Sequence, residues 1–113
     1  MRYFQTRFLP EAEAFLERLD RKAVKKVLYT IDLAEQTNDP KLVKKVTSDL
    51  WEFRILWEGM HYRFLAFWDK QGVQPALVIA THGFVKKSSK IPVRELERAI
   101  RIRKGYFEGT SIH

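Results

Sequence analysis

WEFRILWEGM, residues 51–60, is the stretch that decides the fold. Large apolar side chains stand at every second position from Trp51 to Trp57, which is typical of a β-strand with one buried face. We interpret Gly59-Met60 as a tight hairpin turn and residues 61–69 as the returning strand. The nearly continuous apolar run at 76–85 then predicts a central strand of the same sheet.

Upstream of this stretch the apolar residues follow the period of helices. Pro10 suits the first turn of a helix, which we expect to end near Asp20. Asp20 then caps a second helix, because its carboxylate accepts hydrogen bonds from the first free N–H groups. That helix ends before Pro40, and residues 41–49 predict a linker.

The two ends of the chain complete the pattern. Residues 2–8 are short and mixed in polarity, and they predict an edge strand. Pro92 opens a last helix. We expect its apolar side to carry Val93, Leu96, Ile100 and Phe107.

The order of elements is therefore strand, two helices, three antiparallel strands and a helix. It predicts an α+β fold in which a twisted antiparallel sheet of about four strands is packed by two N-terminal helices, with a C-terminal helix. A chain of 113 residues suits a single domain, residues 1–113. The sequence has no cysteine and no apolar run of roughly 18 residues, so we expect neither disulfides nor a membrane span, and a cytoplasmic protein.

The charge of the chain favours a polyanionic partner. Lysine and arginine number 21 against 14 aspartate and glutamate residues, which gives a formal charge of +7. Nucleic acid is the commonest partner of such a basic domain. A basic but merely solvated surface is the alternative.

Two arginines on neighbouring strands are candidates for chemistry on a phosphate. Glu52 and Arg54 are two residues apart and face the same side of their strand. With residues 59 and 60 as the loop, Arg54 lies opposite residue 65 and Arg63 lies on the diagonal, about 7–8 Å away. Guanidinium groups so close need a shared anion, and a phosphate would serve. An ion-pair network of Glu52 and Arg54 without catalytic meaning is the alternative.

The segment after the central strand adds further candidates. His82 ends that strand at the mouth of a basic loop, and its near-neutral pKa suits an acid or base, although a core histidine is the alternative reading. Lys86, Lys87 and Lys90 follow in the loop. Three histidines without cysteines do not show the spacing of metal ligands, so no metal is expected.

The motifs of residues 50–92 resemble those of a known toxin family. The chain reads L-W-E-F-R at 50–54, Y-R at 62–63 and H-G-F-x-K-K-x-x-K-x-P at 82–92. This pattern is similar to the phage-derived, HigB-like branch of the RelE toxin superfamily. The resemblance implies a RelE-like fold and the toxin of a type II toxin–antitoxin system, a ribosome-dependent mRNA endonuclease. Such an enzyme works through attack of the RNA 2′-hydroxyl, without a cofactor.

These observations give two sets of site residues. The expected catalytic residues, with Glu52 and His82 as proton carriers, are Arg54, Arg63, His82, Lys86 and Glu52. The expected contacts to RNA or the ribosome are Lys87, Lys90, Lys44, Lys45 and Phe84.

The resemblance also implies partners. They are the ribosome with its mRNA, a cognate HigA-like helix-turn-helix antitoxin, and operator DNA bound through the antitoxin complex. Two alternatives stay open: a ParE-like toxin that acts on DNA gyrase without nuclease activity, and a basic RNA- or DNA-binding module without catalysis.

Overall fold

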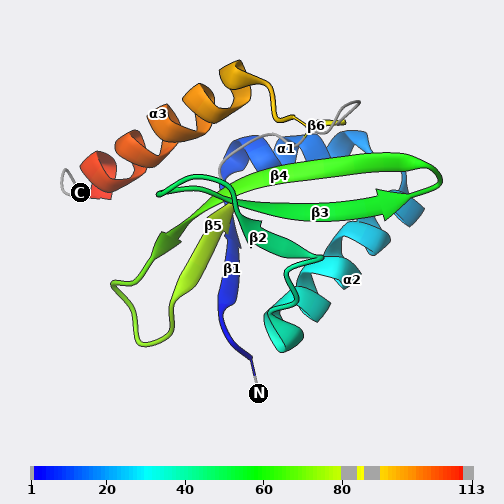
Figure 1. The fold of residues 1–113 in the computed structure, drawn as a ribbon, viewed down its shortest axis with the longest axis horizontal. Helices are drawn as coiled ribbons and strands as arrows, with labels where there is room; N and C mark the ends of the chain where they lie inside the picture. Colours follow the sequence, from blue (N-terminus) through cyan, green and yellow to red (C-terminus); the bar gives the residue numbers. More distant parts are fainter. Residues whose placement is uncertain (1, 80–83, 86–89, 111–113) are drawn as a thin grey trace.

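The computed structural model describes residues 2–79, 84–85 and 90–110, with the backbone alone at 84, 85 and 110. Its helices and strands are β1 Gln5–Phe8, α1 Pro10–Arg18, α2 Arg21–Thr37, β2 Val43–Lys45, β3 Trp51–Trp57, β4 Met60–Asp69, β5 Ala76–Ile79, β6 Phe84–Val85 and α3 Val93–Thr110. The strands form one sheet in the order β1-β5-β4-β3-β2, and β6 pairs with β4. The expected α+β fold is confirmed, and it is compatible with a RelE-like fold (Figure 1).

The sheet is mixed, so the expectation of a wholly antiparallel sheet is wrong for the first strand. β1 lies at one edge, as predicted, but it runs parallel to β5, with Gln5 opposite Ala76 and Phe8 opposite Ile79. The two strands are separated in sequence by two helices and the central hairpin. The alternation of side chains reveals that a segment is a strand, but it carries no information about the direction of a distant partner.

The expected linker at residues 41–49 contains β2, which pairs antiparallel with β3. A tight turn makes this pairing possible: the N–H groups of Val46 and Thr47 donate to the carbonyl of Leu50, at 2.9 and 3.2 Å. The Thr47 hydroxyl in turn accepts from the Leu50 N–H at 3.0 Å. The strand has a single buried residue, Val43, among exposed lysines, which is too weak a pattern to indicate a strand from sequence.

The turn of the β3–β4 hairpin differs by one residue from the expected one. Glu58 and Gly59 have positive φ angles of 49° and 77°, the combination found in two-residue type I′ hairpin turns. Trp57 therefore pairs with Met60, and Arg54 lies directly opposite Arg63 instead of residue 65. The shift changes the register by two residues, so each side chain keeps its predicted face.

The sheet is covered on both faces by different helices. On one face α1 and α2 pack over an aromatic core that includes Phe4, Phe53 and Phe64. Asp20 caps α2 as predicted, accepting from the Ala23 N–H at 2.8 Å. On the other face α3, the orange helix in Figure 1, packs over Leu50, Leu65, Phe67 and Val78. None of the described helices is long and apolar enough to cross a bilayer.

The buried side of α3 is only partly the predicted one. Leu96 and Phe107 pack on the sheet, but Val93 and Ile100 are 67% and 51% exposed. Ala99 lies at the contact instead. A helix that touches the sheet along one narrow stripe leaves apolar residues at its margin in solvent.

A polar cluster fixes the C-terminal half of α3 to the sheet. The Tyr106 hydroxyl donates to Asp69 Oδ2 at 2.6 Å, and the Gln71 N–H donates to Oδ1 at 3.0 Å. Arg7 of β1 binds both Asp69 and Tyr106. The Tyr106 hydrogen bond, the Gln71 N–H and the Arg7 charge lower the pKa of Asp69, whereas burial and Asp69 raise the pKa of Tyr106. The cluster therefore holds a carboxylate and a protonated hydroxyl at neutral pH.

We expect Tyr106→Phe to lower the free energy of unfolding by about 1.5–3 kcal/mol at pH 7, the usual contribution of a hydrogen bond to a charged group. The pKa of Asp69 is lower in the folded state, so its contribution is present above the ordinary pKa of aspartate, ~3.9. It is lost as the pH falls through the folded-state pKa. Urea unfolding should therefore give a smaller difference in the free energy of unfolding between wild type and Tyr106→Phe at pH 3 than at pH 7. Tyr3→Phe, at a 61% exposed ring, is the control. A Tyr106→Phe effect that is unchanged in acid would contradict this account.

Candidate active site

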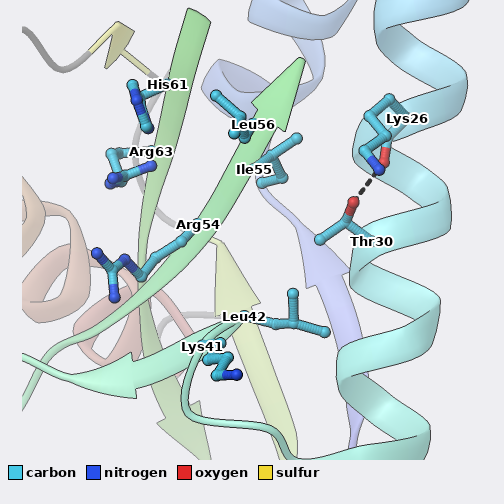
Figure 2. Close-up of a pocket in the computed structure, with 9 residues that line it drawn as sticks. All are labelled: Lys26, Thr30, Lys41, Leu42, Arg54, Ile55, Leu56, His61 and Arg63. Carbon is cyan, nitrogen blue, oxygen red and sulfur yellow. Dashed lines mark hydrogen bonds between the residues drawn. The ribbon is translucent and has the colours of Figure 1, made fainter. Parts of the chain in front are cut away.

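Arg54 of β3 and Arg63 of β4 lie directly opposite each other in the sheet. Both share a face with Leu65, because alternate residues of a strand point to the same side. Figure 2 shows both side chains on the side of the strands away from α2. The Arg63 side chain is 7% exposed and that of Arg54 is 34% exposed. Like charges opposite each other destabilise a sheet, so this pair requires a counter-charge.

Glu52 supplies that counter-charge from the position next to Arg54 on the same face. Its carboxylate is fully buried, with Oε1 3.6 Å from Arg54 Nε and Oε2 3.6 Å from Arg63 Nε. Arg63 Nη1 also donates to the carbonyl of Tyr62 at 3.3 Å. Each guanidinium group is thus held through its inner nitrogen. Among the described residues, the outer nitrogens of Arg54 have no hydrogen-bond or ion-pair partner.

The electrostatics of the cluster favour the arrival of an anion. Burial lowers the pKa of Arg63, Glu52 opposes that effect, and the nearby Arg54 charge lowers the pKa further. Arginine remains charged at neutral pH, so one buried carboxylate faces two cations. A phosphate that reached the outer nitrogens would add negative charge where the cluster has an excess of positive charge.

Three predicted RNA-binding lysines gather beside Glu52. A hollow of about 410 Å³, which we call the lysine hollow, is lined by Lys44, Lys45, Val46, Glu52, Lys90, Ile91 and Leu96. Lys44 lies directly opposite Glu52 in the sheet. Lys90 comes from the segment that leads into α3, so it reaches this place only through the fold. The structure therefore brings together residues separated by almost half of the chain.

A second hollow, of about 490 Å³, contains both arginines and lies across the edge of β3. Figure 2 shows this edge hollow and its lining residues, which are Lys26, Thr30, Lys41, Leu42, Arg54, Ile55, Leu56, His61 and Arg63. The site predicted from sequence did not include Lys26, Lys41 and His61. His61 had a usable signal, because it stands two residues before Arg63 and so shares its face. Lys26 and Lys41 had none, since their positions depend on how α2 packs.

Several predicted residues fall on segments that the structure does not describe. His82, Lys86 and Lys87 lie outside the described residues, so their roles stay predictions. The backbone of β6 is placed, with Phe84 opposite Arg63 and Val85 opposite Tyr62. The described backbone between His82 and Lys86 therefore lies beside Arg63.

The environment of Glu52 favours a positioning role over the role of a proton carrier. A general acid or base must come within hydrogen-bond reach of the substrate. Glu52 is fully buried and lies between two guanidinium groups that stand nearer to solvent. Its carboxylate is thus suited to holding the arginines in a fixed geometry.

Together, the paired arginines and the lysines beside them form a cationic site on a small α+β domain. The chain matches the family described as phage-derived protein Gp49-like (DUF891) over residues 14–104. It belongs to this family. The assignment agrees with the resemblance to phage-derived, HigB-like toxins carried by residues 50–92. Among proteins with curated descriptions, no significant match was found.

Proposed function

We propose that this chain is the toxin of a type II toxin–antitoxin system and cleaves mRNA on the ribosome. The observation that carries the proposal is the arginine pair Arg54 and Arg63, placed directly opposite each other and held by the buried carboxylate of Glu52. The lysine hollow beside the pair supplies further cations for an RNA backbone. Family membership and the resemblance to HigB-like toxins support the same class of function.

The chemistry follows from the charge that RNA cleavage creates. The 2′-hydroxyl loses a proton and attacks the adjacent phosphorus, and the pentavalent transition state carries additional negative charge. Fixed cations such as Arg54 and Arg63 stabilise that charge without having to reorganise. A proton donor and acceptor each contribute ~10²–10⁴-fold. His82 is the candidate for this proton transfer that the sequence predicts, and His61, which lines the edge hollow, is a second candidate.

The proposed partners follow from this assignment. The toxin acts in the cytoplasm, where it meets ribosomes and mRNA, and a HigA-like helix-turn-helix antitoxin encoded beside it holds it inactive. The complex of the two binds operator DNA through the antitoxin.

We expect the chain, expressed alone, to arrest growth and to cut transcripts at discrete positions within translated codons. Primer extension of cellular mRNA measures the cuts, and isolated ribosome–mRNA complexes test the chemistry. Cleavage in these complexes should persist in a chelator while the ribosomes stay intact, and should leave 2′,3′-cyclic phosphate or 3′-phosphate ends.

Three results would contradict the proposal. They are normal growth with verified folded protein, products with 3′-hydroxyl ends, and inhibition of DNA gyrase supercoiling without any mRNA cuts. The last result would instead identify a ParE-like toxin.

A further inference from the structure

The side of α2 that faces away from the sheet core is strongly cationic in its N-terminal half. Residues 21–31 contain no aspartate or glutamate, and Arg21, Lys22, Lys25 and Lys26 supply four positive charges. The first carboxylates of the helix, Asp32 and Glu35, are paired with Arg2. The carboxylate of the N-cap Asp20 offsets only one of these four charges. This surface therefore attracts an anionic partner.

An aromatic groove accompanies these cations. A hollow of about 270 Å³, which we call the α2 groove, is lined by Lys22, Lys25, Lys26, Tyr29 and Trp57. The Tyr29 side chain is among the exposed large apolar groups, at 61%. The Lys26 ammonium nitrogen lies 5.7 Å from the centre of the Tyr29 ring. Aromatic rings flanked by cations are the usual platform for single-stranded nucleic acid, because bases stack on the rings while phosphates meet the cations.

The α2 groove is continuous with the arginine pair around the edge of β3. Lys26 lines both the α2 groove and the edge hollow that contains Arg54 and Arg63. β2 pairs with β3 only as far as Phe53, and the Arg54 N–H then bonds the carbonyl of Leu42. Beyond that bond, β2 gives no cover to the β3 edge at residues 55–57. The edge hollow spans this point, with Lys26 and Thr30 of α2 on one side of β3 and the two arginines on the other (Figure 2).

We propose that the α2 groove is a binding surface for single-stranded RNA, joined to the arginine pair over the edge of β3 that lies beyond the end of β2. This proposal rests on the proposed function in one respect, namely that the arginine pair holds the phosphate to be cleaved. An RNA strand anchored there continues past Lys41 and Lys26 and stacks a base on Tyr29 or Trp57. Cations along the whole route and aromatic rings at its end favour RNA over an acidic protein segment.

The first test measures binding of a fluorescent 2′-O-methyl oligouridine, which cannot be cleaved because it lacks the attacking hydroxyl. The triple variant Lys22→Ala, Lys25→Ala and Lys26→Ala should bind this RNA more weakly. The slope of log K against the logarithm of the salt concentration should also become shallower by about 2, because each lost phosphate contact to single-stranded RNA removes ~0.7 from it. Alanine suits helix positions, so the fold should be retained, as urea unfolding checks. The matched control removes three exposed cations elsewhere: Lys70, Arg101 and Lys104. It should leave the salt dependence near that of wild type.

The second test isolates the ring. Tyr29→Leu keeps an apolar side chain but removes the stacking surface, so RNA affinity should fall about fivefold or more with unchanged salt dependence. Poly-glutamate has no bases to stack, so its own dissociation constant, measured by direct titration, should be the same for wild type and Tyr29→Leu.

The outcomes separate this proposal from the proposed function. Unchanged RNA affinity in both the triple variant and Tyr29→Leu overturns the α2 groove as an RNA site, even if the wild type cuts mRNA. So does a triple variant that loses poly-glutamate binding while keeping RNA binding, which would identify an acidic protein as the partner. Weakened RNA binding in both variants supports the groove, even if the wild type cuts no mRNA and the proposed function fails.

Discussion

Arg54→Ala is expected to slow mRNA cleavage on the ribosome by ~10²–10³, the usual effect of removing one group that stabilises transition-state charge. Its side chain is 34% exposed and held by Glu52 through Nε alone among the described residues, so the change should cost little stability. Single-turnover cleavage of a ribosome-bound transcript measures the rate, and urea unfolding measures the stability. Arg101→Ala, an exposed arginine of α3, should cut at the wild-type rate.

Arg63 requires a different substitution, because it is buried. Arg63→Ala would remove one of the cations that face Glu52 among the described residues, and would lower both rate and stability. Arg63→Lys keeps the charge but loses the planar group that binds phosphate through two nitrogens. We expect a folded protein that cuts slowly. Wild-type cleavage rates in both Arg54→Ala and Arg63→Lys, each correctly folded, would show that the active site lies elsewhere.

The largest effect on stability is expected from Glu52. Glu52→Gln leaves the Arg63 charge buried without its counter-charge, and breaking a buried pair in this way costs about 3–5 kcal/mol. Urea unfolding measures the loss. Replacing both partners by apolar residues, Glu52→Leu with Arg63→Met, should recover most of the stability but no cleavage, since such a swap removes the desolvated charges together.

Two substitutions, Glu52→Asp and Glu52→Gln, separate two roles for the carboxylate of Glu52. If Glu52 only positions the arginines, Glu52→Asp should lower the cleavage rate and leave the shape of its pH profile unchanged. A Glu52→Gln protein with wild-type stability and no cleavage would identify Glu52 as a proton carrier instead.

The sequence predicted those parts of the fold that depend on neighbours along the chain. The alternation at Trp51 to Trp57 and the cap at Asp20 are local patterns, and the structure confirms both. The register of the hairpin was missed by two residues because it depends on the left-handed backbone of Glu58. Glutamate rarely adopts that conformation, so the sequence pointed to the next pair of residues.

The site was predictable to a similar extent. Glu52 and Arg54 share a face because they are two residues apart, which sequence alone establishes. Their meeting with Lys44 and Lys90 depends on β2 and on the segment before α3, which no local pattern places. No local pattern indicates Lys26 either, since its closeness to the edge hollow arises from the packing of α2.

The parallel pairing of β1 with β5 has a consequence for the order in which the protein folds. Gln5 leaves the ribosome well before its partner Ala76, which is made only after the central hairpin is complete. Contacts so distant in sequence form late, because the entropy cost of closing a long loop comes before the contacts can stabilise the chain. The nascent chain therefore carries β1 without its partner strand until β5 has been made. A domain built in this way completes its sheet only after the strand that joins β1 to the central hairpin has left the ribosome.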